Sequence, residues 1–240
     1  MITSEQWRAI DSIVSIFETG KLPAAESYST CTILPDGAGI SYGKHQATAR
    51  SGSLQEILTA YMDREPDIAP TSGPVEMAAL LRESRSYSSE AAASAGVRGL
   101  MEFLRRAGTD PKMVAAQDAV FAIRYWAPAV EICRNLGLVT ALSHLTVYDV
   151  LIQSDAARLA MLRNDFAESP PARGGNERKW TSSFNSARRA WLENFRSADT
   201  ARARAINRSA YRAIALEQLC ATGKWDLNLP LTVRGVTIPR

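Results

Sequence analysis

Two acidic residues near the N-terminus have the types and positions that acid–base chemistry requires. Glu18 ends a helical pattern just before Gly20, and Asp36 follows 18 residues later in the turn sequence Pro35-Asp36-Gly37. Cleavage of a glycosidic bond needs two carboxyl groups, because one protonates the leaving oxygen while the other activates water or attacks the sugar. Each residue also has an ordinary structural interpretation, a solvated helix end for Glu18 and a turn former for Asp36.

A serine close to this pair adds a second chemical group. Ser41 lies five residues after Asp36, where its hydroxyl could hold the water that Asp36 activates. The segment Gly39–Gly43 also matches G-x-S-x-G, the nucleophile elbow of α/β-hydrolases, with His144 completing a triad. That elbow needs alternating strands and helices, whereas helical patterns follow here. The serine hydrolase is therefore the weaker alternative, and we interpret His144 as a core residue and His45 as a groove or surface residue.

The elements that must position these residues are predicted from local signals. Thr3 and Gln6 have the spacing of a capping box for a first helix that ends at Gly20. The segment Thr30–Leu34 is expected to be extended, and the glycine-interrupted segment Gly39–Thr48 favours a small hairpin. These patterns predict one β element near the N-terminus.

Helical patterns dominate the remainder of the chain. A second helix is expected to start at Ser53, which is spaced from Glu56 like another capping box. Further helices are predicted over residues 74–85, 97–107, 111–135 with a kink at Pro128, 138–153, 155–167, 177–197 and 200–222. Residues 138–153 are apolar nearly all round, which indicates a central buried helix. The predicted fold class is mainly α (α+β), as a single domain over residues 1–240.

The composition excludes several classes of protein. The chain has 240 residues, of which 46% are hydrophobic and 22% are charged, so disorder, collagen and coiled coil are excluded. No run of 18 apolar residues occurs, so we expect no transmembrane helix and no membrane insertion. The acidic, amphipathic N-terminus does not resemble a signal peptide. The 3 Cys and 2 His have no metal-ligand spacing, so we expect reduced cysteines, no metal and no cofactor.

The net charge of +3 hides an uneven distribution. Residues 1–157 carry 13 basic and 18 acidic side chains, whereas residues 158–212 carry 12 basic and 5 acidic ones. A basic segment of this kind suits a polyanion, either a nucleic acid or an anionic cell-wall polymer. The alternative is a solvated helix surface with some arginines buried in ion pairs.

The motif around Asp36, read together with Glu18, resembles a known family. Glu18, Asp36 and the string D-G-x-G-x-[S/T]-x-G are similar to the catalytic region of the family 46 glycoside hydrolases, the chitosanases, in the lysozyme superfamily. Four further segments resemble this family in the same order along nearly the whole chain: SGSLQEILTAY, VYDVLIQS, PPARGGNERKWTSSFNSARRAW and GKWDLNLPLT. The resemblance implies a lysozyme-like helical bundle, with a small N-terminal β-hairpin lobe flanking a substrate groove.

The resemblance also implies roles for individual residues. Glu18 takes the place of the general acid and Asp36 that of the general base. Ser41 stands where the family has a threonine that orients the water. Asp149 and Arg188 match a buried ion-pair network that steadies the acid. A further arginine of this network is matched by Arg202, Arg208 or Arg212, and we select Arg208.

Two departures from the family concern the substrate. Ser53 stands where chitosanases have a carboxylate that binds the sugar amine, and Ala38 replaces an arginine two residues after the base. Tyr42 and His45 are the other expected substrate-binding residues. A neutral Ser53 fits an N-acetylated sugar, and together with the basic segment it favours peptidoglycan over chitosan. The ordinary interpretation of Ser53 is a helix N-cap.

These observations lead to one preferred hypothesis and two alternatives. The expected function is endo-hydrolysis of β-1,4 bonds in an amino-sugar polymer, peptidoglycan first, by an inverting acid/base mechanism. The alternatives are a chitosanase and, from another class, a non-catalytic glycan-binding domain. The expected partner is a polysaccharide and not nucleic acid, and we expect a monomer. Without a signal peptide, the protein would be made in the cytoplasm and would reach an extracellular or periplasmic polymer as a secreted effector, through a delivery system, or as a phage endolysin.

Overall fold

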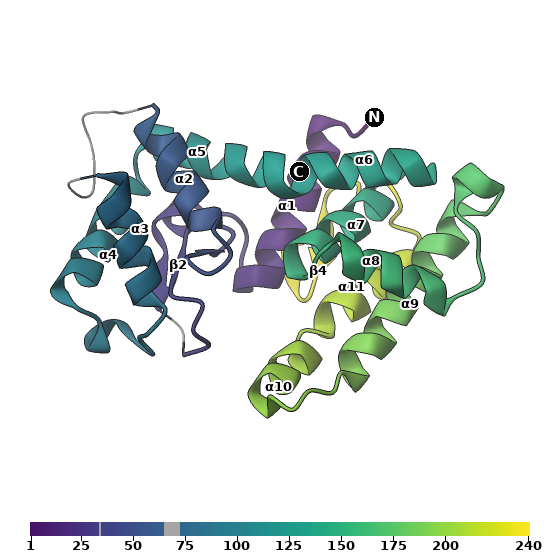
Figure 1. Cartoon of the computed structure of the whole chain (residues 1–240). Helices are drawn as coiled ribbons and strands as arrows, with labels where there is room; N and C mark the ends of the chain where they lie inside the picture. Colours follow the sequence, from purple (N-terminus) through teal and green to yellow (C-terminus); the bar gives the residue numbers. More distant parts are fainter. Residues whose placement is uncertain (34, 65–72) are drawn as a thin grey trace. The chain divides into compact units, whose positions relative to one another are not determined.

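The computed structural model describes residues 1–33, 35–64 and 73–240, except for the side chains of residues 201 and 202 (Figure 1). The chain divides into two units. Unit 1 comprises Met1–Leu22 and Tyr125–Arg240, and unit 2 comprises Pro23–Arg124. Each unit is described separately below. Leu34, the last residue of the predicted extended segment, and the side chain of Arg202 lie outside the described part.

Unit 1 is built around one buried helix. Helix α7 spans Ala141–Gln153, and its residues from Ala141 to Leu151 are all buried. Helices α1 (Ser4–Thr19), α6 (Ala127–Leu136) and α11 (Tyr211–Ala221) pack against it. Its other elements are α8 (Ala156–Leu162), α9 (Glu177–Asn194), α10 (Thr200–Arg208) and the short 3-10 turns Arg163–Asp165 and Pro171–Arg173. The prediction of a central buried helix is confirmed.

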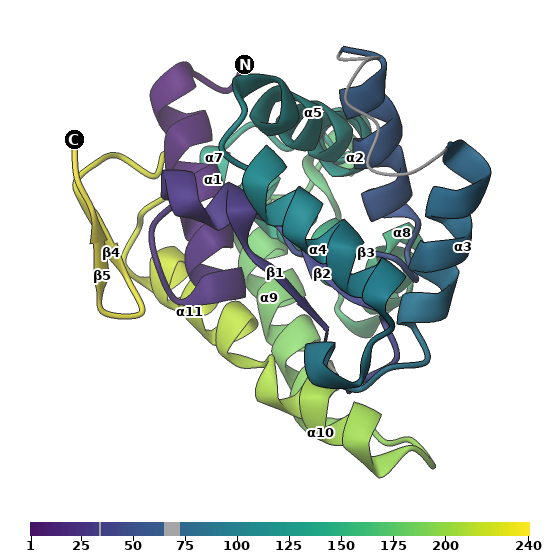
Figure 2. The ribbon, with the colours of Figure 1, turned by 90° about the vertical axis from the view of Figure 1, so that its left-hand side faces the viewer.

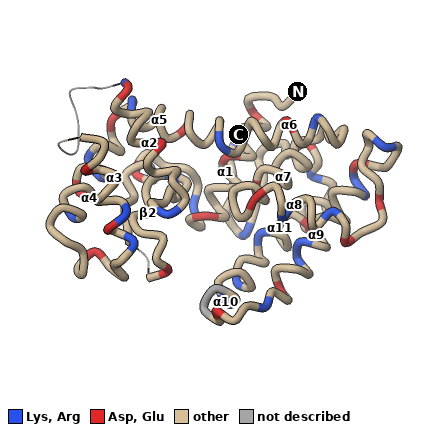
Figure 3. The backbone as a smooth tube through the Cα atoms, viewed as in Figure 1, with Lys and Arg blue, Asp and Glu red and all other residues tan. Residues whose placement is uncertain are grey.

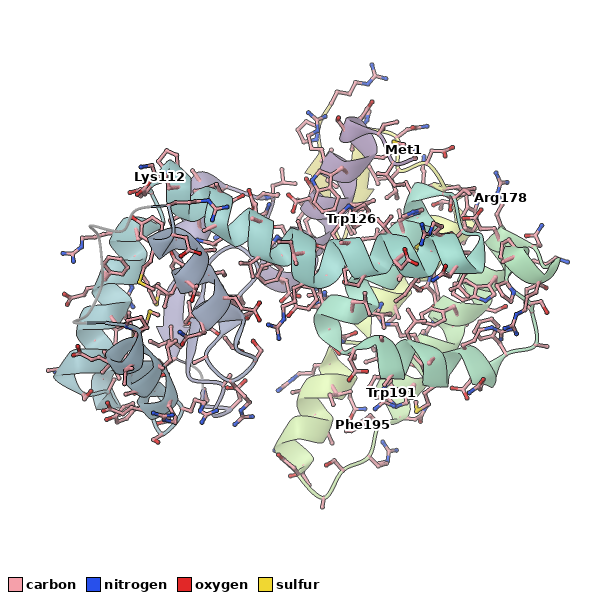
Figure 4. All side chains as sticks on the ribbon, turned by 45° about the horizontal axis from the view of Figure 1, so that its top comes forward. Met1, Lys112, Trp126, Arg178, Trp191 and Phe195 are labelled. Atoms are coloured by element: carbon pink, nitrogen blue, oxygen red, sulfur yellow. The ribbon has the colours of Figure 1, made fainter. Side chains whose placement is uncertain are left out.

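A second, smaller apolar cluster stabilises the end of unit 1 that carries α10. Leu192, Ala210 and Ala213 are buried there, and Trp191 packs against them. The Trp191 ring meets that of Phe195 at 5.3 Å between centroids in an edge-on arrangement, at the C-terminal end of α9 (Figure 4). These contacts hold α10 and the start of α11 against α9.

The described residues of unit 2, 23–33, 35–64 and 73–124, form a three-stranded antiparallel sheet and four α-helices. The strand order is β1 (Cys31–Ile33), β2 (Ile40–Tyr42) and β3 (Ala47–Thr48), with β2 in the middle (Figure 2). Ile33 pairs with Ile40 across the turn that contains Asp36. The helices are α2 (Ser53–Met62), α3 (Pro74–Ser84), α4 (Ala95–Ala107) and α5 (Pro111–Phe121), and the 3-10 turns are Ala25–Ser29 and Glu90–Ala92. The predicted hairpin is therefore present as β2 and β3, and β1 lies in the segment that was predicted to be extended.

The start of the first helix follows its sequence signals closely. Thr3 and Gln6 form the predicted capping box, and Gly20 ends α1 in the left-handed conformation with its N–H donating to Ile16. The second helix differs from the prediction. Its N-cap is Gly52, also left-handed, and Ser53 is already the first helical residue. The spacing of Ser53 and Glu56 therefore does not mark a capping box.

Several predicted helix boundaries also change. The predicted helix 111–135 is interrupted by a π-helical turn, Ala122–Trp126, just before Pro128. A proline has no N–H and clashes with the carbonyl four residues earlier, which accounts for the irregular hydrogen bonding there. The predicted helix 200–222 is two helices, separated at Ser209 and Ala210.

A C-terminal hairpin in unit 1 was not predicted. Strands β4 (Leu231–Val233) and β5 (Val236–Ile238) pair antiparallel through a turn at Arg234 and Gly235. Both turn residues have positive φ, 51° and 79°. The sequence signal was the pair of short β-branched runs on either side of Arg-Gly, which is typical of a two-residue hairpin loop.

Candidate active site

Glu18 lies at the end of α1, where the helix stops at Gly20. Its side chain is 20% exposed, and its Oε1 atom accepts a hydrogen bond at 2.7 Å from Nη1 of Arg212 on α11. The guanidinium of Arg212 is 5% exposed. Glu18 therefore presents a carboxylate with some access to solvent that is held from behind by a buried cation.

Asp149 lies in the middle of the buried helix α7 and holds this cation in place. Its side chain is fully buried, and Oδ1 lies 2.5 Å from Nη2 of Arg212 while Oδ2 lies 2.6 Å from Nη2 of Arg188. Arg188 also donates to Gln153, one turn after Asp149. Asp149 therefore joins two buried arginines, and one of them, Arg212, also contacts Glu18.

Two opposing effects set the pKa values in this cluster: burial disfavours the charged form of each group, and the neighbouring opposite charge favours it. Burial alone would raise the pKa of Asp149, but Arg212 and Arg188 hold that pKa below its usual range. Burial would lower the pKa of Arg212, but Asp149 and Glu18 together raise it. The pKa of Arg188 is lowered by its burial, which outweighs the attraction of Asp149. Asp149 is thus ionised and Arg212 is a permanent cation.

The structure revises one member of the predicted network. Arg208 ends α10 and is exposed, whereas Arg212 is 4% exposed on the inner face of α11. The break at Ser209 and Ala210 starts a new helix, and this changes which arginine faces Asp149. Gln153 was not singled out from the sequence, although its position four residues after Asp149 places both on one face of a helix.

Asp36 lies in unit 2, in the turn between β1 and β2. It is exposed, and its Oδ1 accepts a hydrogen bond at 2.9 Å from the N–H of Ala38. Gly37 has φ 70°, and a Cβ there would lie 2.6 Å from Nη2 of Arg50. The left-handed conformation favours glycine at this position, whereas the Arg50 guanidinium is the end of a flexible side chain that could move aside. The turn presents the Asp36 carboxylate on a defined backbone.

Ser41 and Tyr42 lie on the middle strand of the sheet in unit 2. Ser41 pairs with Thr32 on one side and with Thr48 on the other, and it is 3% exposed. A serine in the middle of a three-stranded antiparallel sheet is not on a strand-to-helix elbow, so the serine-hydrolase alternative loses its geometry. Tyr42 is 1% exposed, so its side chain is covered by the core of unit 2 and leaves almost no surface for a ligand to contact.

The other residues expected to bind substrate are buried within unit 2. His45 is 7% exposed and its ring lies against that of Phe121 with 4.5 Å between centroids, so the surface position is wrong, while the alternative of a groove residue stays a prediction. Burial, helped by the charge of Lys44, lowers the pKa of His45 to about 3. Ser53 is 1% exposed, and its hydroxyl accepts the N–H of Thr48 at 3.1 Å. Both side chains serve the packing of the turn after β2 and the start of α2.

The remaining chemical candidates take structural places. His144 lies in α7 with its Nδ1 2.9 Å from the carbonyl oxygen of Thr140, as expected of a core histidine. The three cysteines are reduced. Within the described ranges, no group of three or more His, Cys, Asp or Glu could hold a metal ion, and no helix is long and apolar enough to cross a membrane.

A largely helical scaffold with a small antiparallel sheet is the architecture of the lysozyme-like fold, and a pair of carboxyl groups is what hydrolysis of a glycosidic bond requires. The model of glycosyl hydrolase family 46 matches residues 12–231, so the chain belongs to this family and is a glycoside hydrolase.

Relatives with known names agree with this assignment. The chain is 27% identical over 240 residues to a chitosanase of Bacillus subtilis (strain 168), covering 97% of this chain and 83% of the relative. Among solved structures, native chitosanase from Bacillus subtilis MY002 has a TM-score of 0.82 at 24% identity, covering 99% of this chain and 100% of that one. That likeness confirms the lysozyme-like fold.

Two solved structures of related enzymes contain sugars. A mutant chitosanase from Bacillus subtilis MY002 complexed with 6 GlcN has a TM-score of 0.81 and 25% identity, covering 98% of this chain and 96% of that one. A Gynuella sunshinyii family 46 chitosanase in complex with chitotetraose has a TM-score of 0.79 and 26% identity, covering 99% of this chain and 98% of that one. These relatives support the chitosanase alternative better than the preferred peptidoglycan hypothesis, which none of them supports.

Proposed function

We propose that this protein is an endo-acting chitosanase that hydrolyses β-1,4 bonds of chitosan, with Glu18 as general acid and Asp36 as general base. The observation that carries the proposal is the environment of Glu18. Its carboxylate is 20% exposed and is bound by Arg212, which is in turn bound by the buried Asp149. A family 46 scaffold supplies this group at the end of α1, and the named relatives are chitosanases.

The proposed reaction is a single displacement at the anomeric carbon. Glu18 donates its proton to the glycosidic oxygen as the bond to the anomeric carbon breaks. Asp36 removes a proton from a water molecule, whose oxygen forms the new bond from the opposite face. An inverting pair of carboxyl groups requires a separation of roughly 6.5–9.5 Å, which leaves room for that water. The Ser41 hydroxyl is proposed to orient this water, as expected from its place in the motif.

Arg212 has a specific part in this scheme. It is a permanent cation whose Nη1 atom donates to Oε1 of Glu18, so it fixes the orientation of the carboxyl group without taking its proton. After proton transfer the same contact stabilises the glutamate anion. Asp149 and Arg188 keep Arg212 in one position because they are buried and hydrogen-bonded to each other.

The basic segment no longer favours a polyanionic substrate. Six of its 12 basic residues make contacts inside unit 1, namely Arg158 with Trp191, Arg163 with Phe166, Arg178 with Trp225, Arg188 and Arg212 with Asp149, and Arg189 with Glu193 and Glu217. Figure 3 shows basic positions along α9 and α10. Ion pairs offset part of the excess charge that suggested peptidoglycan, and aromatic rings hold three further arginines in place.

The experiment that tests the substrate compares chitosan with peptidoglycan. The purified protein is incubated with fully deacetylated chitosan and, separately, with purified peptidoglycan, and new reducing ends are measured together with product masses. We expect reducing ends from chitosan only, with oligomers of intermediate length as early products of an endo-acting enzyme. Release from peptidoglycan with none from chitosan would reverse the proposal.

A further inference from the structure

We propose that Tyr211, itself held by Arg234 of the C-terminal hairpin, is a positioning residue for the carboxylate of Glu18. This inference rests on the proposed role of Glu18 as general acid. The Tyr211 hydroxyl donates a hydrogen bond to the carbonyl oxygen of Phe17, the residue directly before Glu18. The next residue, Arg212, binds the Glu18 carboxylate at 2.7 Å. The first turn of α11 thus holds both the backbone and the side chain at one position.

The carbonyl of Phe17 needs such a partner because of where α1 ends. The last four carbonyl groups of an α-helix have no N–H partner within the helix. The N–H of Gly20 satisfies the carbonyl of Ile16, and the Tyr211 hydroxyl satisfies that of Phe17. The two aromatic rings also meet edge to face, with 6.3 Å between the centroids of Phe17 and Tyr211. Tyr211 therefore caps α1 at the turn that carries Glu18.

Arg234 contacts the ring of this tyrosine. Its guanidinium carbon lies 3.8 Å from the centroid of the Tyr211 ring, within the range of a strong cation–π contact. Arg234 is exposed and has φ 51°, a left-handed conformation that is unfavourable for an arginine. Turns with positive φ at both central residues strongly prefer Asn-Gly, Asp-Gly or Gly-Gly. The contact with Tyr211 gives a reason for an arginine at a position where glycine would fold better.

Substitution of Tyr211 tests the capping contact. Tyr211→Phe keeps the ring but removes the hydroxyl, so the turn that carries Glu18 loses one fixed point. We expect kcat on chitosan to fall about tenfold while KM stays within twofold, because a small misplacement of an acting group slows chemistry more than binding. Tyr87→Phe is the matched control in unit 2, since the Tyr87 hydroxyl donates at 2.7 Å to Glu83. It should leave kcat unchanged.

Substitution of Arg234 separates positioning from stability. Arg234→Gly relieves the left-handed strain, so the Tm should stay the same or rise, whereas kcat should fall several-fold with KM unchanged. Arg234→Lys keeps a cation over the ring and should retain most of kcat. Arg134→Gln, which removes an exposed arginine paired with Glu131, is the control. A residue with only a structural role in the hairpin would show activity and Tm moving together.

Amide hydrogen exchange tests the contact between Tyr211 and the end of α1 without any substrate. In Tyr211→Phe, and more weakly in Arg234→Gly, exchange should become faster in the peptide that covers the end of α1 and not in peptides from α2. If the wild type is inactive on chitosan but this change appears, the positioning inference stands and the proposed function fails. If the wild type is active and both variants keep wild-type kcat and exchange, the positioning inference is overturned while the function stands.

Discussion

At the scale of single residues, the carboxylate of Glu18, which we propose as the general acid, is held by a chain of buried charged groups. Arg212 is fixed by Asp149, which is fixed again by Arg188, and each link is a hydrogen bond between charged groups at 2.5–2.7 Å. Such bonds are roughly twice as strong as neutral ones. The carboxyl group that we propose as the proton donor is therefore fixed by Arg212, although its side chain is 20% exposed.

Glu18→Gln should abolish cleavage of chitosan while leaving the Tm close to that of the wild type. The amide cannot act as a general acid, but its oxygen can still accept the hydrogen bond from Arg212. We expect at least a hundredfold loss of reducing-end release. Glu56→Gln is the matched control, because Glu56 forms a comparable 2.6 Å pair with Arg124 at the surface of unit 2. A Glu18→Gln variant that retains more than a tenth of the wild-type rate would remove Glu18 as the acid.

Asp149→Ala should lower the free energy of unfolding by about 3–5 kcal/mol, because it leaves Arg188 and Arg212 buried without their shared counter-ion. Equilibrium unfolding in urea measures this change. Asp155→Ala provides the comparison, since Asp155 is the N-cap of α8 and its loss should cost only about 1 kcal/mol. Equal effects of the two substitutions would show that the buried network contributes little to stability.

The sequence predicted the cluster only in part. Asp149 stood out because a carboxylate in an apolar helix needs a partner, and the family resemblance pointed to Arg188. The choice between Arg208 and Arg212 depends on where one helix ends and the next begins. No strong local signal marks the break at Ser209 and Ala210, so the sequence alone could not select the correct arginine.

At the scale of elements, the start of α2 shows how a correct spacing can mislead. Ser53 precedes Glu56 by three residues, but the left-handed Gly52 precedes the helix and Ser53 turns inward. Its hydroxyl accepts from Thr48 and lies 2.7 Å from that of Ser51, which ties β3 to α2. A tertiary contact has replaced the local capping bond.

Ser53→Asp should therefore destabilise the protein by roughly 1–3 kcal/mol, since it places a carboxylate where the serine is 1% exposed. The same change at Ser94, a true N-cap whose side chain accepts from Val97, should be within about 0.5 kcal/mol of neutral. Thermal unfolding of both variants is the measurement. Ser53→Asp with wild-type stability would mean that this side chain reaches solvent.

The turn after β2 should make stability depend on pH. The pKa of His45 is about 3 in the folded protein, against about 6.5 in an unfolded chain. The contribution of the neutral His45 ring to the free energy of unfolding is complete above pH 6.5. It is lost as the pH falls toward 3, because the unfolded chain binds a proton that the buried ring does not. We expect a loss of roughly 2–3 kcal/mol between pH 7 and pH 4.5 from this group.

Unfolding in urea at several pH values tests this expectation. His45→Gln should show a smaller decline between pH 7 and pH 4.5 than the wild type. Burial also lowers the pKa of His144, so part of the decline in stability should remain in the His45→Gln variant. Adding His144→Gln to that variant should reduce the remaining decline. Identical pH dependence in the wild type and His45→Gln would place His45 in contact with water.

Elements with strong local signals were predicted well and the others were not. The capping box and the glycine end of α1 are contained in the sequence near the helix itself, and the burial of α7 follows from its apolar surface. The C-terminal hairpin was missed because its strands have three residues each, and its turn uses Arg234, which a local rule disfavours. Its contact with Tyr211 is a tertiary feature that no local pattern reveals.

At the scale of the whole molecule, the family resemblance predicted the fold, whereas the distribution of charge favoured peptidoglycan, a substrate that the named relatives do not support. Residues 158–212 looked like a basic surface because their arginines were counted without their partners. The structure pairs Arg188 and Arg212 with Asp149 and stacks Arg158 on Trp191. A count of charges therefore says little about a ligand until the internal ion pairs are known.

The most direct test of the central claim is real-time proton NMR of the hydrolysis of a glucosamine hexamer. The claim predicts that the wild type cleaves the hexamer and that the α-anomer of the new reducing end appears first, because water attacks from the face opposite the leaving group. Glu18→Gln should give no product over the same period. A β-anomer appearing first would show that Asp36 does not act through water, and no cleavage by the wild type would contradict the proposed function itself.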